Sequence, residues 1–139
     1  MNTKNPSITP ELKVTNFKAS LDFYTKLAGF VVLYDRPENN FAMLGLNGSR
    51  LMIEELTDGS RTWKVGELEQ PFGRGMHFQI EVDAVDALHQ KFLDAKCPIF
   101  FETEEKWYRM GDQETGNRQF LVQDPDGYLL RFYQDLGVR

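Results

Sequence analysis

Val14-Thr-Asn-Phe-Lys-Ala-Ser-Leu-Asp-Phe-Tyr24 has a counterpart 68 residues later, Val82-Asp-Ala-Val-Asp-Ala-Leu-His-Gln-Lys-Phe92. In both stretches a short apolar strand meets an Asn or Asp that can cap a helix, and an amphipathic helix follows. A break at small residues or proline and a second apolar strand come next, and each copy then ends as strand, tight turn and strand. The chain therefore contains an internal repeat of the form β-α-β-β-β.

A single unit of this kind leaves one face of its sheet open and needs its twin to bury it. We therefore predict an α+β fold in which two tandem β-α-β-β-β modules pack together, with a cavity between them. The modules are expected at about residues 8–62 and 76–136, joined by a linker at about 63–75, within a single domain spanning 1–139. The cavity between the copies is the expected place for a ligand.

The apolar patterns also place the individual elements. Strands are predicted at residues 12–15, 30–34, 41–46, 50–56, 77–82, 99–102, 118–123 and 128–134, and helices at 17–27 and 84–95. Asn47-Gly48 and Asp124-Pro-Asp-Gly127 are turn signals between strands. The polar linker is expected to hold a short helical turn at 65–68, and residues 103–117 are predicted to form a long loop.

Composition excludes several classes of function. The net charge of −5, without a basic block, argues against nucleic-acid binding, which depends on neutralising phosphates, and mildly favours cationic ligands. No apolar run reaches the length of a membrane span, and residues 1–7 lack the apolar stretch of a secretory signal. The single cysteine, Cys97, forms no internal disulfide and is interpreted as a small buried hydrophobe, so we expect a cytoplasmic protein.

Three motifs together resemble the vicinal oxygen chelate superfamily: Ala19-Ser-Leu-Asp-Phe-Tyr24, Val82-Asp-Ala-Val-Asp-Ala-Leu88 and Asp124-Pro-Asp-Gly-Tyr-Leu-Leu-Arg131. That group includes glyoxalase I, extradiol dioxygenases, fosfomycin-resistance enzymes and bleomycin-resistance proteins, and the resemblance is nearest to the last of these. It covers roughly residues 12–136, nearly the whole chain. The resemblance implies that the two β-α-β-β-β modules form a half-rolled sheet around one shared cavity, usually within a homodimer.

In the metal enzymes of the superfamily, His and carboxylate side chains near the start of each first strand and on each last strand hold a divalent ion. The matching positions in this sequence are Thr9, His77, Glu54 and Arg131. Thr9 is a poor ligand, and the Arg131 guanidinium has no lone pair to donate and would repel the ion. A catalytic divalent site normally needs three protein ligands, so we predict no metal and no other cofactor, with His77 and Glu54 as the only weak metal candidates.

An ionic role suits these residues better. Glu54 and Arg131 are expected to face each other across the cavity, with His77 beside them, either as a buried salt bridge between the modules or as ligand-contacting groups. His89 is expected on the outer face of its helix and is assigned no chemistry.

The aromatic residues favour ligand binding. Trp63 lies in the linker, and Trp107 and Tyr108 lie in the predicted loop, where rings can sandwich a flat heteroaromatic ligand. Phe41, Phe132 and Tyr133 lie on strands that should curve round the cavity, although one of the last two is expected to be ordinary core. The predicted ligand-binding set is Phe41, Glu54, Trp63, His77, Trp107, Tyr108, Arg131 and Tyr133.

The first functional hypothesis is a metal-independent, homodimeric protein that sequesters a cationic, aromatic, antibiotic-type small molecule, as the resemblance to bleomycin-resistance proteins implies. The alternative is a glyoxalase-like metal-dependent isomerase or lyase, or a thiol transferase, with His77, Glu54 and a third ligand such as Glu81 or Gln79. A third hypothesis is a structural or regulatory dimer whose cavity is vestigial.

Overall fold

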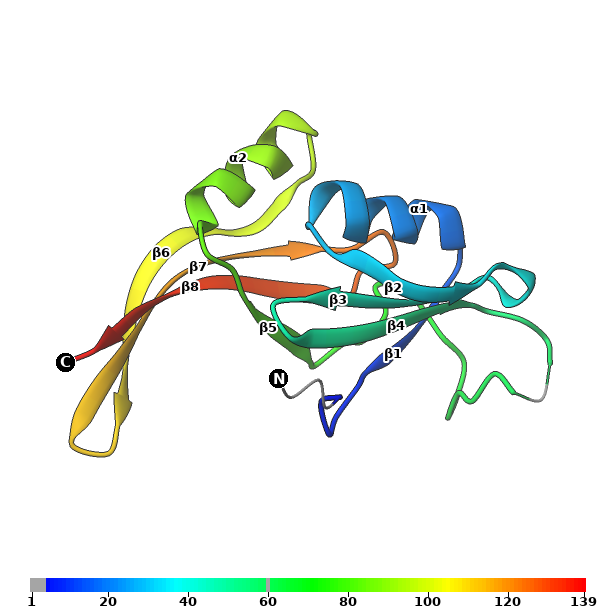
Figure 1. The fold of residues 1–139 in the computed structure, drawn as a ribbon, viewed down its shortest axis with the longest axis horizontal. Coiled ribbons are helices and arrows are strands. Elements are labelled where there is room, and N and C mark those ends of the chain that lie inside the picture. The colour runs from blue at the N-terminus through cyan, green and yellow to red at the C-terminus, as the bar shows by residue number, and fades with distance from the viewer. Residues whose placement is uncertain (1–4, 60) are drawn as a thin grey trace. The chain divides into compact units, whose positions relative to one another are not determined.

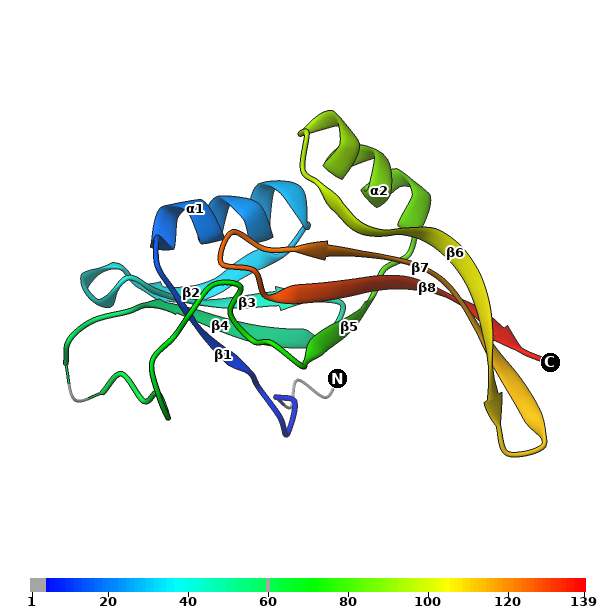
Figure 2. The ribbon, with the colours of Figure 1, turned by 180° about the vertical axis from the view of Figure 1, so that it is seen from behind.

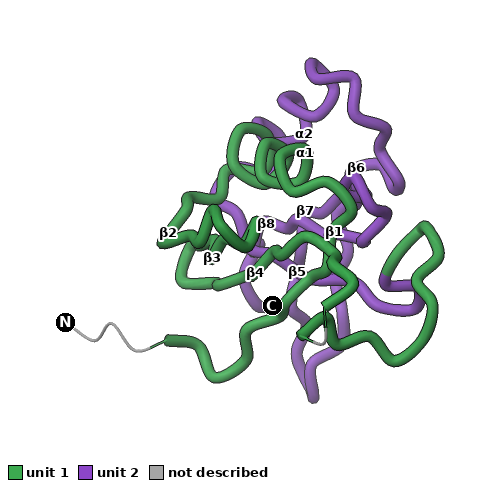
Figure 3. Tube along the Cα trace, turned by 90° about the vertical axis from the view of Figure 1, so that its right-hand side faces the viewer, with its two compact units in different colours: residues 1–72 green, residues 73–139 purple. Residues whose placement is uncertain are grey.

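The computed structural model describes residues 5–59 and 61–139. The chain forms two compact units, one ending at Phe72 and the other beginning at Gly73 (Figure 3). Each unit contains one four-stranded sheet and the helix that covers it, and the two units are described separately below.

Unit 1 contains the strands β1 (Glu11–Val14), β2 (Val31–Arg36), β3 (Phe41–Leu46) and β4 (Ser49–Glu55), arranged in the order β1-β4-β3-β2. β1 runs parallel to β4, whereas β3 is antiparallel to both β4 and β2. The helix α1 (Phe17–Asp22) continues into a π-helical turn, η1 (Phe23–Leu27), and a short 3-10 turn, η2 (Pro37–Asn39), follows β2. In Figure 1 this helical segment lies over one face of the sheet.

Unit 2 repeats this topology with β5 (His77–Glu81), α2 (Val85–Asp94), β6 (Ile99–Met110), β7 (Gln113–Gln123) and β8 (Leu129–Val138). The order of its strands is β5-β8-β7-β6, again with the first strand parallel to the last. Figure 2 shows α2 over one face of this sheet and the long, bent hairpin of β6 and β7. The prediction of two tandem β-α-β-β-β modules in an α+β fold is confirmed.

Both helices are tied to the last strand of their own module. The backbone N–H of Phe17 donates to Glu55 at the end of β4 (2.9 Å), and that of Val85 donates to Gln134 on β8 (3.1 Å). Asn16 also caps α1, because its Oδ1 accepts from the Ala19 N–H at 3.0 Å, as the sequence predicts. The Asp expected to cap α2 does not do so, because Ala84 occupies the N-cap position. The Gln134 side chain accepts from the free N–H of Val85 instead.

The core of unit 2 is a cluster of phenylalanine rings between α2 and the sheet. Phe92 on the helix lies 5.8 Å from both Phe120 on β7 and Phe132 on β8, measured between ring centroids. Because side chains alternate along a strand, Gln119 and Arg131, which adjoin Phe120 and Phe132, face the side of the sheet away from α2. Phe132 is therefore the core member of the Phe132–Tyr133 pair, and Tyr133 is the half-buried one.

Two predicted elements are wrong. Residues 103–117 do not form a loop but lie largely in the β6–β7 hairpin, where Trp107 pairs with Gly116 and Tyr108 with Thr115. No helical turn forms at residues 65–68, where Val65 is fully exposed and has no apolar surface to pack against. No helix within the described part of the chain is long and apolar enough to cross a membrane.

Candidate functional site

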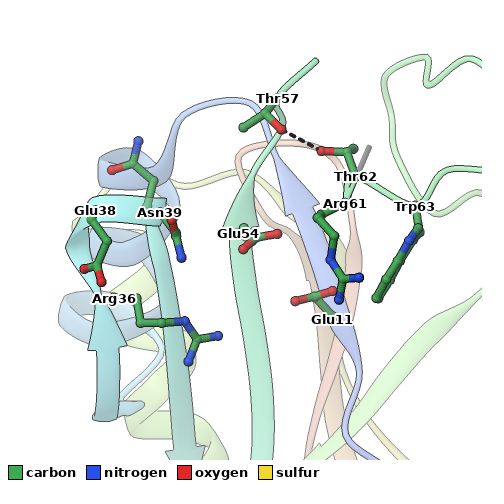
Figure 4. A pocket seen from close by; sticks show the side chains of 10 residues that line it. Glu11, Arg36, Glu38, Asn39, Glu54, Thr57, Arg61, Thr62 and Trp63 are labelled. Atoms are coloured by element: carbon green, nitrogen blue, oxygen red, sulfur yellow. Dashed lines mark hydrogen bonds between the residues drawn. The ribbon is translucent and has the colours of Figure 1, made fainter. Parts of the chain in front are cut away.

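Unit 1 carries a hollow of about 510 Å³ that is lined by β1, β4, the β2–β3 connection and the segment after β4. Figure 4 shows Glu54 in its middle, with Glu11, Arg61 and Trp63 on one side and Arg36 on the other. This hollow brings together two residues of the predicted ligand-binding set, Glu54 on β4 and Trp63 in the segment that follows β4.

The carboxylate of Glu54 is bound by a lysine that the sequence analysis missed. Lys13 Nζ lies 2.5 Å from Glu54 Oε1 and 3.7 Å from Glu11 Oε1, and the Lys13 side chain is almost fully buried. The two strands bring these groups together because Lys13 on β1 and Glu54 on β4 are partners in the parallel register. A lysine inside the apolar strand Leu12–Val14 was the available signal, since such a charge must find a partner.

Replacing Glu54 with Gln is expected to destabilise unit 1 by roughly 1–3 kcal/mol, because the buried Lys13 ammonium loses its nearer carboxylate, while Glu11 lies 3.7 Å away. The double variant Lys13→Met/Glu54→Gln is expected to regain most of that loss. Urea unfolding of the two single variants and the double variant measures the coupling between the residues.

The exposed pair Lys18–Asp22 on α1 is the matched control, with 3.1 Å between its charged atoms. The hydrogen bond from Lys18 is the main reason why the pKa of Asp22 lies below its ordinary value. Lys18→Met is expected to leave stability unchanged because this pair is exposed to water. An equal loss in Lys18→Met and Glu54→Gln would contradict a special role for the buried ammonium.

Two arginines that the sequence analysis did not single out cover aromatic rings in or beside this hollow. The Arg61 guanidinium carbon lies 4.5 Å from the ring centre of Trp63, whose side chain is 67% exposed. The Arg36 guanidinium carbon lies 3.9 Å from the ring centre of Phe41, which is itself buried in β3. The face of Trp63 therefore already accepts a planar cation from the protein's own chain.

Unit 2 carries a second hollow, of about 360 Å³, on the face of its sheet away from α2. Three members of the predicted set line it: Tyr108, Arg131 and Tyr133. Arg131 donates to Gln119 Oε1 at 2.9 Å and to Tyr108 Oη at 3.3 Å. The predicted ionic pair of Glu54 with Arg131 would join the two units and stays a prediction. Each of the two side chains has partners within its own unit.

The remaining members of the predicted set line neither hollow. His77 is exposed at the start of β5, and Phe41 is buried beneath Arg36. Trp107 is half-buried on β6, where its ring packs so closely on Gly116 that a Cβ there would come within 2.7 Å. The Arg139 guanidinium carbon also lies 4.1 Å from the Trp107 ring centre, so this ring is engaged within its own unit.

The residues at the metal positions of the superfamily do not fit a divalent ion. Glu54 is bound to the Lys13 ammonium, Arg131 is a permanent cation, and Thr9 precedes β1. Nowhere in residues 5–59 and 61–139 do three His, Cys, Asp or Glu side chains lie close enough to hold a metal. Cys97, next to Pro98, is half-buried, and burial raises the pKa of its thiol above the ordinary value, which lowers its reactivity.

Two β-α-β-β-β units in tandem define a class of α+β proteins built by duplication. The family model described as the Glyoxalase/Bleomycin resistance protein/Dioxygenase superfamily matches residues 9–132. Proteins named bleomycin resistance protein from Geobacillus stearothermophilus and Staphylococcus aureus are 31% identical to this chain over 137 residues, covering 91% of it and 95% of each relative.

Among solved structures, TioX from Micromonospora sp. ML1 is similar with a TM-score of 0.71 and 21% identity, covering 95% of this chain and 100% of that chain. A protein of unknown function from Agrobacterium tumefaciens str. C58 has a TM-score of 0.69 and 24% identity, covering 98% of this chain and 95% of that chain. These two likenesses support the fold alone. The chain belongs to the glyoxalase/bleomycin resistance protein/dioxygenase superfamily.

Proposed function

We propose that this protein binds a bleomycin-type small molecule, cationic and aromatic, and acts by sequestering it without chemical change. The observation that carries the proposal is the exposed Trp63 ring in the unit 1 hollow, with a guanidinium already seated on it. A planar cation of the ligand can take the place of Arg61 on that ring, and the Glu11 carboxylate lines the same hollow. The 31% identity to bleomycin resistance proteins supports the same class of ligand.

A homodimer is part of the proposal. β2 is an edge strand of the unit 1 sheet, and its apolar residues Val31, Val32, Leu33 and Tyr34 are all exposed. An exposed apolar edge strand is typical of a surface that a second chain covers. Native mass spectrometry of the protein as purified from its cells counts the subunits and shows any bound mass.

Titration with metal-free bleomycin tests the ligand assignment through tryptophan fluorescence, because Trp63 and Trp107 are the only tryptophans. In Trp107→Phe, where Trp63 alone reports, we expect saturable quenching with the affinity of the unaltered protein. Trp63→Ala is expected to weaken binding by about 5- to 30-fold, the loss of roughly 1–2 kcal/mol of cation–π and stacking energy.

Trp63→Phe is the matched control, since it keeps an aromatic face, and binding measured by calorimetry should weaken less than in Trp63→Ala. Unchanged affinity in Trp63→Ala, or quenching confined to Trp107, would place the ligand elsewhere. Elemental analysis that found one stoichiometric transition metal per chain, together with turnover of a substrate, would favour the glyoxalase-like enzyme over the binding protein.

A further inference from the structure

Arg131 is held in a fixed position on the open face of the unit 2 sheet. Its Nε–H donates to Gln119 Oε1 (2.9 Å), and Nη2 donates to Tyr108 Oη (3.3 Å). Gln119 is buried, and its amide nitrogen donates to Glu104 Oε2 at 2.9 Å and to Tyr108 Oη at 2.7 Å. These bonds fix the guanidinium plane without neutralising its charge, since both of its direct partners are neutral.

The hydrogen bonds of this network leave several donors without an acceptor. A guanidinium carries five N–H groups, and the contacts to Gln119 and Tyr108 use two of them, so no described residue accepts from the edge with Nη1. Tyr108 Oη already accepts from two donors, and its own hydrogen is therefore left to donate. The Asn117 side chain lines the same hollow at 6% exposure, and among the described residues its amide makes no hydrogen bond.

Arg131 also forms no direct ion pair with a described carboxylate. Within the described ranges, no carboxylate lies within ion-pairing distance of Arg131; Glu104 is bound to Gln119 instead. Asp135 lines the hollow too, but it lies four residues further along β8, a separation of about 13 Å along an extended strand, and its Oδ1 accepts from the Gly137 N–H. The part of the hollow around Arg131 is thus positive and rich in donors.

We propose that this hollow binds the carboxylate group of a small molecule. The open guanidinium edge suits the two oxygens of a planar carboxylate, which arginine binds in a bidentate manner. The Tyr108 hydroxyl can donate a further hydrogen bond to the same group, and the Asn117 amide can bond to a neighbouring polar group. The site lies wholly within unit 2 and does not depend on the bleomycin-type ligand proposed for unit 1.

Benzoate, benzamide and benzylammonium serve as probes that share a ring and differ in charge. Each is titrated into the full-length ¹⁵N-labelled protein at constant ionic strength, with the Nε–Hε signal of Arg131 followed by NMR. We expect a saturable shift of that signal with benzoate only. Arg131→Gln should weaken benzoate binding, measured by calorimetry, by at least about tenfold, because a charge-assisted pair of hydrogen bonds is lost.

Arg118→Gln is the matched control. Arg118 lies on β7, the neighbouring strand, but it already pairs with Asp86 (2.9 Å) and Glu105 (3.7 Å), so its removal should leave benzoate binding unchanged. Tyr108→Phe provides a second test should Arg131→Gln fail to fold, and we expect about threefold weaker binding because one donor is lost.

Three results would overturn the proposal. Benzamide could bind as tightly as benzoate, the two single variants Tyr108→Phe and Arg131→Gln could both keep the unaltered affinity for benzoate, or benzoate could cause no saturable shift of the Arg131 signal. Stronger binding of inorganic phosphate than of benzoate would also overturn it, since the site would then select a tetrahedral anion. The bleomycin titration of Trp107→Phe reports on Trp63 in unit 1 alone, so either proposal can fail while the other holds.

Discussion

Replacing Phe120 with alanine is expected to lower the free energy of unfolding by about 3–5 kcal/mol. The ring is completely buried on β7 and contacts Phe92 and Phe132, each with 5.8 Å between ring centroids, and His89 at 5.2 Å. Its removal leaves a cavity between α2 and the sheet that rigid aromatic neighbours cannot fill. Guanidinium chloride unfolding followed by circular dichroism measures the loss.

Phe100→Ala is the matched control for this prediction. Phe100 lies on β6 of the same unit, but its side chain is 58% exposed, so its removal should change stability by less than about 0.5 kcal/mol. Similar losses for the two variants would show that the phenylalanine cluster is not the main source of stability in unit 2.

The repeat was predictable because each module buries one face of its sheet against one helix, and burial leaves a periodic apolar pattern. The alternation of Leu130 and Phe132 with Arg131 and Tyr133 on β8 is of this kind. The hairpin turn at Asn47-Gly48 was predictable for a different reason: an Asn-Gly pair favours a two-residue turn, and both residues adopt positive φ.

The β6–β7 hairpin was not predictable from such a pattern. Along β6, exposed and half-buried residues follow one another without alternation, so residues 103–110 carry no period of two. The strand is held instead by its backbone hydrogen bonds to β7 and by the contact of Trp107 with Gly116. A glycine opposite a tryptophan leaves no trace in a hydrophobicity pattern.

The sequence predicted which charged residues belong to the candidate site, but not the side chains that bind them. The sequence predicted matching positions for Glu54 and Arg131 in the two modules, but the registers place them two residues apart. Glu54 pairs with Lys13, whose counterpart 68 residues later is Glu81, and Glu81 pairs with Tyr133, whereas Arg131 pairs with Gln79. The partner lysine and the network of Gln119 depend on which strands lie side by side. That information comes from the topology and not from local spacing.

The two modules therefore place opposite charges on equivalent strands. In unit 1 a carboxylate is neutralised by the buried Lys13, so the free binding surface there is the exposed indole of Trp63. In unit 2 the guanidinium of Arg131 is oriented by neutral groups and keeps its charge. Divergence of the two last strands, β4 and β8, after duplication gives one chain two hollows of different chemistry.

Asp124→Ala is expected to destabilise unit 2 by about 2–4 kcal/mol, although no helix or strand contains this residue. Asp124 is 5% exposed, and its Oδ1 accepts hydrogen bonds from the backbone N–H groups of Asp126 and Tyr128, both at 2.9 Å. Alanine would remove the side-chain oxygen that accepts from both of these amides in a mostly buried turn. Thermal unfolding followed by circular dichroism measures the effect.

Two further variants separate the hydrogen bonds from the charge. Asp124→Asn keeps an oxygen in place and should cost less than half as much as Asp124→Ala, because both amides retain an acceptor. Asp112→Ala, in the exposed turn between β6 and β7, should have no measurable effect. If Asp124→Asn were as damaging as Asp124→Ala, the negative charge itself would hold the turn. The Asp-Pro-Asp-Gly turn would then be stabilised by the charge of Asp124 rather than by its hydrogen bonds to the backbone.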